Sequence, residues 1–92
     1  MHETSLVRDL VAKAVAEAER HGAASVASVE VRVGALSGIS EGVLRSQFDH
    51  AVAGTSLAAA RLDVILGPDG VEALSDEQAG HVVLTGLEVE EV

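Results

Sequence analysis

The 92-residue sequence contains no cysteine and only one aromatic residue, Phe48. The lack of cysteine excludes disulfides, thiolate zinc sites and cysteine nucleophiles together. With a single aromatic ring, the hydrophobic core has to be built from Val, Leu and Ala, which bury less area per residue than aromatic side chains do. We therefore expect a short sheet covered by helices, with neither a large pocket for an organic cofactor nor any cofactor-binding residues.

Positive charge is also scarce, with 6 Lys and Arg against 15 Asp and Glu and a formal net charge of −9. No basic patch can be assembled from so few cations, so neither nucleic acid nor an anionic membrane surface is an expected partner. No apolar run approaches the roughly 20 residues that a membrane-spanning helix needs. The length fits a single domain over residues 1–92, which we expect to be cytoplasmic.

The stretch from residue 27 to residue 48 gives the clearest structural pattern. Val29, Val31 and Val33 alternate with polar residues and predict a strand with one apolar face. Gly34 and Gly38 flank the turn that follows, because glycine reaches backbone angles that are closed to other residues. The chain then enters a helix, so the stretch predicts a strand, a turn and a helix in succession.

The remaining elements follow from periodicity and turn residues. Alternation predicts strands over residues 60–66 and 81–89, with Gly86 at a bulge or a close approach. Between them lies an acidic loop, residues 67–80, which starts with a Gly-Pro-Asp-Gly turn and has room for one helical turn. Spacings of three and four predict a helix from Ser40 to about Gly54 and another over residues 5–20, whose buried side holds Leu6, Leu10, Val11, Ala14, Val15 and Ala18.

The predicted architecture is a two-layer α/β domain of the α+β type, in which a three-stranded sheet carries two helices on one face. The order is helix, strand, helix, strand, loop, strand. Strand order within the sheet stays open. Exposed edges in so small a sheet also leave a homodimer open.

The sequence begins with Met1-His2-Glu3, directly before the first predicted helix. The α-amine, the backbone amide nitrogens and the His2 imidazole can form fused chelate rings, and such a planar nitrogen set suits Ni(II) or Cu(II) better than zinc. A histidine near a chain end is also typical of a frayed tail. On these residues alone, both interpretations stand.

No catalytic residues are predicted, and we do not expect an enzyme. Ser37, Ser40, Asp49 and His50 contain the residue types of a nucleophile set, but no Gly-x-Ser-x-Gly elbow occurs and Ser40 fits better as a helix cap. His21 is interpreted as a solvated residue at a helix end. The glutamates near residue 90 are interpreted as a solvated strand edge rather than a hard-cation site.

Taken in order, several segments resemble the HypA family of hydrogenase nickel-incorporation proteins. They are Met1-His2-Glu3 at the start of a helix, then Val31-Arg32-Val33-Gly34-Ala35-Leu36-Ser37-Gly38-Ile39, Phe48, Gly54-Thr55 and Leu62-Asp63-Val64. The resemblance implies that Met1, His2 and Glu3 bind Ni(II). It also implies the accessory GTPase HypB and the hydrogenase large subunit as partners.

The chain departs from the family in two places. The family carries a zinc hairpin with two Cys-x-x-Cys pairs, where this chain has residues 67–80 and no cysteine, so the resemblance is to the nickel domain without its zinc-binding domain. Some members also have an acidic residue near the metal after the Leu-Ser-Gly turn, where this chain has Ser40 followed by Glu41. These two residues are possible additional ligands.

Two functions are consistent with these residues. The first is a nickel-binding accessory protein, similar to a metallochaperone, for NiFe hydrogenase maturation, with Ni(II) as its metal and no zinc. The second is a metal-independent interaction or scaffold module that keeps the HypA fold and docks on a maturation factor or an enzyme subunit.

Overall fold

The computed structural model describes residues 3–90, with side chains from residue 5 onward. Its elements are α1 (Glu3–Arg20), β1 (Val26–Val33), α2 (Glu41–Ala51), β2 (Arg61–Leu66), the 3-10 helix η1 (Gly70–Ser75) and β3 (Val82–Val89). The predicted order of helices and strands is confirmed, and the boundaries differ from the prediction by a few residues.

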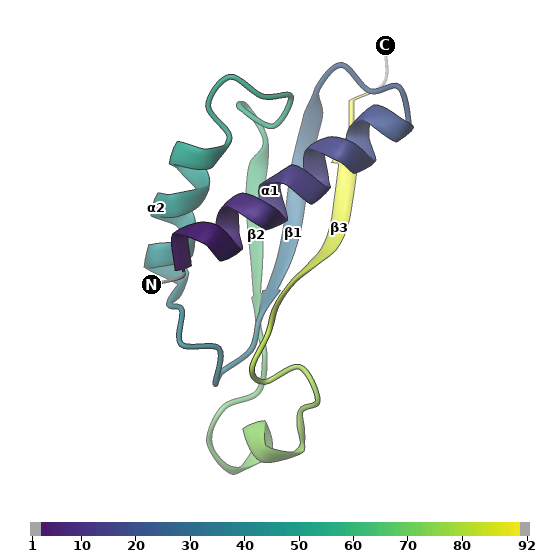
Figure 1. Ribbon diagram of the computed structural model, residues 1–92. Helices are drawn as coiled ribbons and strands as arrows, with labels where there is room; N and C mark the ends of the chain where they lie inside the picture. Colours follow the sequence, from purple (N-terminus) through teal and green to yellow (C-terminus); the bar gives the residue numbers. More distant parts are fainter. Residues whose placement is uncertain (1–2, 91–92) are drawn as a thin grey trace.

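β1 is the central strand of a sheet with the order β2-β1-β3. It pairs in parallel with β2 and antiparallel with β3. A parallel pair needs a crossover connection, which α2 supplies. Both α1 and α2 lie on one face of the sheet, with α1 running diagonally across it (Figure 1). The two layers are therefore one sheet and one pair of helices, as the sequence predicts.

The hydrophobic core lies between these layers. Val29, Val31 and Val33 are all buried, so the alternation in β1 is a correct guide to its inner face. From α2, Leu44 and Phe48 meet them, and Leu57 joins from the segment after the helix. Because the core has one ring and otherwise small aliphatic groups, it depends on close packing of many Val, Leu and Ala side chains.

The buried side of α1 matches the prediction at Leu10, Val11, Ala14 and Ala18 and differs in the first turns of the helix. Leu6, expected inside, is 39% exposed, whereas Val7 is fully buried. Counting back from the buried Leu10 by three residues reaches Val7 and by four reaches Leu6, so the helical period alone does not choose between them. Leu6 therefore lies at the border of the helix–sheet contact.

The predicted alternation in β2 fails at its end. Leu62 is 7% exposed, but Leu66, expected on the same inner face, is 62% exposed. In Figure 1 the sheet continues beyond the two helices at the lower end, so the last residues of β2 have no helix above them. The period of the strand is right, and the extent of the covering layer is what the sequence does not show.

The two glycines of the turn after β1 have different roles. Gly38 has φ +83°, the left-handed region that was expected. Gly34 does not need unusual angles, and the backbone carbonyls of Gln78 and Ala79 instead occupy the space where its side chain would be. Gly34 also donates its backbone N–H to the carbonyl of His81 at 2.9 Å. Its requirement is therefore steric.

The prediction for Gly86 is confirmed in both of its parts. The β1–β3 register shifts between Glu30, opposite Gly86, and Val31, opposite Leu84, which leaves Thr85 as the extra residue of a bulge. A Cβ on Gly86 would lie 3.3 Å from the Cβ of Glu30.

Residues 67–80 form a short lobe at the lower end of the sheet (Figure 1). The expected helical turn is present as η1, while residues 67–69 are irregular where a four-residue turn was predicted. Within residues 3–90, no helix is long and apolar enough to cross a membrane.

Gly34→Ala should lower the free energy of unfolding by about 1–3 kcal/mol, because the new methyl group meets backbone carbonyls that can move only with the lobe. Urea denaturation measures this. Gly42→Ala is the matched control, since Gly42 lies in α2 with open space around it and should gain about 0.5–1 kcal/mol from helix propensity. Equal effects at the two sites would contradict the steric role of Gly34.

Candidate metal site

The predicted ligands are Met1, His2 and Glu3, and α1 begins at Glu3. Met1 and His2, and the side chain of Glu3, fall outside the described part of the structure, which gives only the backbone of Glu3 as the first residue of the helix. The three predicted ligands thus stay predictions. What the structure contributes is the position of the helix that follows them.

The beginning of α1 lies close to the beginning of α2. The two helices pack against each other, and in Figure 1 the first turn of α1 lies across the lower end of α2, where that helix starts. This end of α2 holds Ser40 and Glu41, the two additional candidates. The fold therefore brings the start of α1 and the Ser40–Glu41 turn to the same side of the molecule.

Ser40 caps α2. Its backbone is extended, with φ −89° and ψ 161°, and its Oγ accepts a hydrogen bond from the backbone N–H of Val43 at 3.2 Å. The carbonyl of Ser40 accepts the first intrahelical bond, from the N–H of Leu44 at 2.9 Å. The interpretation of Ser40 as a helix cap is confirmed.

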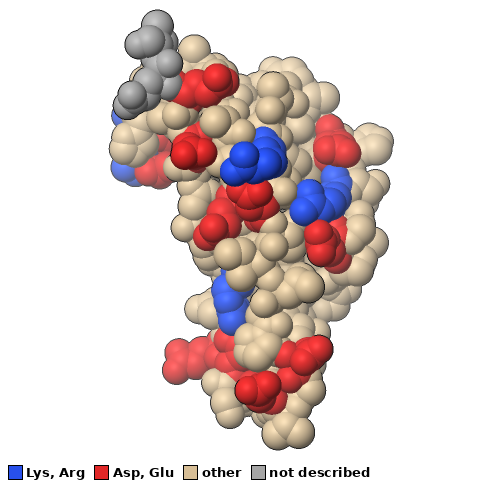
Figure 2. All heavy atoms as spheres, turned by 180° about the vertical axis from the view of Figure 1, so that it is seen from behind, with Lys and Arg blue, Asp and Glu red and all other residues tan. Residues whose placement is uncertain are grey.

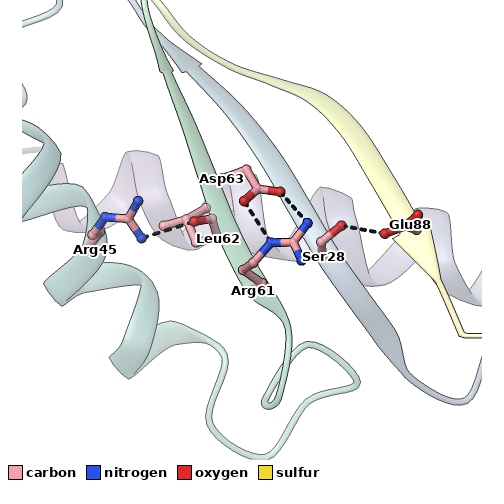
Figure 3. Close-up of polar contacts among 6 residues, drawn as sticks. All are labelled: Ser28, Arg45, Arg61, Leu62, Asp63 and Glu88. Carbon is pink, nitrogen blue, oxygen red and sulfur yellow. Dashed lines mark hydrogen bonds and ion pairs between the residues drawn. The ribbon is translucent and has the colours of Figure 1, made fainter.

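Glu41 is engaged with Arg45 one turn later. Arg45 Nε donates to the Glu41 carboxylate at 3.0 Å, and Arg45 Nη1 donates to the backbone carbonyl of Leu62 in β2 at 3.0 Å. Figure 3 shows the second contact, in which the guanidinium reaches from α2 to the neighbouring strand. Glu41 thus has a structural partner in addition to its favourable place in the first turn of a helix.

The three described histidines lie apart from one another in local settings of their own. His21 is exposed beside Glu17, with 3.3 Å between its Nε2 and a carboxylate oxygen. His50 is exposed and its Nδ1 lies 3.0 Å from the carbonyl of Ser46. His81 is exposed just before β3. Among the side chains of residues 5–90, no group of three or more His, Asp and Glu is placed to hold a metal ion.

A hollow lies elsewhere, between α1 and β3. It measures about 890 Å³ and is lined by the apolar Leu84, Leu87 and Val89 on one side and by Lys13 and Arg20 on the other. Glu17 and His21 also line this open groove along an edge strand, but they are only two donors, and no third His, Asp or Glu among the described residues completes a metal site with them.

The open face of the sheet carries polar contacts within β2 and between β1 and β3. The guanidinium of Arg61 donates to both oxygens of Asp63, at 2.8 and 3.0 Å, and Ser28 Oγ donates to Glu88 at 3.2 Å (Figure 3). The hydrogen bond from Arg61 lowers the pKa of Asp63 and raises the pKa of the guanidinium. Figure 2 shows Lys and Arg side chains next to Asp and Glu side chains over the upper part of this side of the molecule, whereas the lower end is mostly acidic.

Arg32 and Asp76 join the sheet to the lobe. Arg32 Nη2 donates to Asp76 Oδ2 at 2.9 Å, and Asp76 is only 10% exposed. The backbone N–H of Gln78 and the Arg32 guanidinium hold the pKa of the Asp76 carboxyl below its usual range. The sequence analysis missed this pair, because the two residues are 44 positions apart and alternation predicts only that Arg32 points away from the core.

The chain is similar in sequence to a known family and in fold to solved structures. The model of the family "Hydrogenase/urease nickel incorporation, metallochaperone, hypA" matches residues 1–72. The chain belongs to the HypA family. A hydrogenase maturation factor HypA from Roseiflexus is 37% identical over 107 residues, covering 98% of this chain and 87% of that protein. A HybF maturation factor from Salmonella typhimurium is 38% identical over 68 residues, covering 74% of this chain and 60% of that protein.

The HypA fold is also found by comparison of structures. A solution structure of the Ni metallochaperone HypA from Helicobacter pylori superimposes with a TM-score of 0.79 at 21% identity, covering 97% of both chains. At that identity the likeness concerns the fold. Several HypA and HybF relatives are matched over little more than half of their own length, as with 59% of the protein from Nitrosospira multiformis.

Ser40→Ala should lower the free energy of unfolding by about 1 kcal/mol, because the N–H of Val43 loses its acceptor at the start of α2. Thermal or urea unfolding followed by circular dichroism measures the change. Ser46→Ala, at an exposed position inside the same helix, should be neutral or slightly stabilising. A Ser40→Ala variant as stable as the wild type would show that the cap does not hold the helix.

Proposed function

We propose that this HypA-family protein is a nickel-binding accessory protein that acts, without being an enzyme, as a metallochaperone in NiFe hydrogenase maturation. The observation that carries the proposal is the family match over residues 1–72, which includes Met1, His2 and Glu3. The metal-independent scaffold is the less favoured alternative, because the N-terminal chelating sequence is intact.

Met1, His2 and Glu3 are the proposed nickel ligands. The amine, backbone amides and imidazole of such a segment surround a metal from within three consecutive residues, so the site needs little help from the rest of the fold. Ser40 and Glu41 are already bonded to Val43 and Arg45. We therefore assign them to the start of α2, beside which the first turn of α1 lies, rather than to the metal.

His2→Ala should weaken nickel binding by at least about 100-fold, since even loss of a residue behind a metal ligand costs 10- to 100-fold. Isothermal titration of the untagged protein with Ni(II) measures this. An N-terminal tag should have the same effect, because it removes the free amine. His50→Ala is the matched control and should bind as the wild type does, since His50 lies in α2 against its own backbone. Equal nickel affinity of the two histidine variants would refute the proposed site.

Residues 67–80 are proposed to replace the zinc hairpin of the family. The family match ends at residue 72, inside this segment. The alignment with the Roseiflexus protein extends over 107 residues, more than the 92 of this chain, so that relative carries residues with no counterpart here. The chain has no cysteine to ligate zinc, and its lobe is instead joined to β1 by the Arg32–Asp76 pair.

A chelator should therefore leave the protein folded. We expect the unfolding midpoint to be unchanged by excess EDTA, and the purified protein to contain no stoichiometric zinc by elemental analysis. A structural zinc site contributes folding free energy directly, so its removal would lower the midpoint strongly. A fall in the midpoint that added zinc reverses would contradict the proposal.

The proposed partners are the accessory GTPase HypB and the hydrogenase large subunit, and the proposed location is the cytoplasm, where these steps would occur. A homodimer through a free sheet edge is a further prediction. β2 and β3 are both edge strands, and one backbone carbonyl of β2 is already taken by Arg45, so β3 is the edge we expect to pair.

A further inference from the structure

The lobe of residues 67–80 exposes two large apolar side chains side by side. Val71 is 82% exposed and Leu74 is 78% exposed. Both belong to η1, and residues three apart in a 3-10 helix lie on the same side because the helix has three residues per turn. Ala73 is buried at the same time. We refer to Val71 and Leu74 as the apolar knob.

The lobe is held firmly enough to present this knob in one position. Arg32 donates to Asp76 at 2.9 Å. The backbone N–H of Leu36 donates to the carbonyl of Ala79 at 2.7 Å, and the N–H of Gly67 donates to the carbonyl of Val33 at 2.9 Å. Binding elements that are ordered beforehand lose less entropy on association.

The lobe that carries the knob is acidic. The lobe contains Asp69, Glu72, Asp76 and Glu77 and no Lys or Arg. Among the described residues, only Asp76 of these four has an ion-pair partner. Figure 2 shows Asp and Glu side chains gathered at the lower end of the molecule, where the lobe is. A second lobe of the same charge would be repelled, and so would an anionic membrane surface.

The lobe also has an open hollow with acidic residues in its lining. It measures about 430 Å³ and is lined by Pro68, Glu72, Ser75 and Asp76. Two of these four residues are acidic, and Glu72 is exposed. A Lys or Arg from outside can therefore reach a carboxylate next to the knob.

We propose that the apolar knob and the acidic lobe that carries it dock into an apolar depression, rimmed by Lys and Arg, on a protein partner of this chain. The inference rests on the proposed function, from which the two candidate partners come: the accessory GTPase and the hydrogenase large subunit. The acidic side chains of the lobe favour Lys and Arg around the depression on the partner, and Val71 and Leu74 favour apolar residues at its centre. This docking surface is separate from the nickel segment, so metal binding and partner binding can be disrupted independently.

The test is titration of the full chain with each purified partner from the same organism, followed by calorimetry and by backbone amide NMR. The double variant Val71→Ser/Leu74→Ser should bind one partner at least about tenfold more weakly than the wild type. Glu72→Gln should weaken binding less and reduce its salt dependence. Val43→Ser is the matched control, because Val43 is exposed on α2, and should bind like the wild type. Amide shifts on binding should centre on residues 66–76.

Three results would overturn the inference. Equal binding by the double variant and the wild type would place the interface elsewhere. If both proteins still bind nickel in a titration, the proposed function stands despite that result. Failure of the wild type to bind either partner would refute both the docking surface and the partner assignment. Self-association of the wild type that the double variant abolishes, seen by light scattering, would make the occupant a second copy of this chain. Loss of nickel binding with knob-dependent docking retained would refute the metallochaperone proposal alone.

Discussion

The pairing of β1 on both of its edges is the constraint on which the rest of the structure depends. Its parallel pairing with β2 requires a crossover, which places α2 on the sheet. Its antiparallel pairing with β3 brings the chain back from the lobe past Gly34, where two backbone carbonyls fill the space of a side chain. With its valines buried against both α-helices, β1 is joined to the other two strands by hydrogen bonds and to α1 and α2 by packing.

Ion pairs account for much of the scarce positive charge. Arg32, Arg45 and Arg61 each have a carboxylate partner, and in each case the pair has a different consequence. The Arg61–Asp63 pair is exposed and contributes little to stability. Arg45 joins α2 to β2, and Arg32 joins the sheet to the lobe. With these cations neutralised, the remaining acidic side chains dominate the outer surface of the lobe.

The proposed nickel segment and the lobe differ in how far they depend on folding. A chelate formed by consecutive residues at a chain start needs only those residues and the freedom to wrap around the metal. The lobe, in contrast, exists through contacts between residues distant in sequence, such as Arg32 with Asp76 and Leu36 with Ala79. The two proposed features therefore lie in separate parts of the chain, and a change in the lobe leaves the proposed metal ligands in place.

The sequence by itself determined the features that depend on neighbouring residues in the chain. These are the inner valines of β1, the cap at Ser40, the bulge at Gly86 and the element order. Each of these follows from local geometry, so a single chain segment carries the information. Only the tertiary structure decided that Val7 rather than Leu6 is buried, that Leu66 is exposed, and that Gly34 is needed for space. These outcomes depend on which neighbour covers a residue and how far that neighbour extends, and no local pattern records either. The same reason explains why the Met1-His2-Glu3 segment was recognisable from sequence, whereas the lobe with its Arg32–Asp76 pair was not.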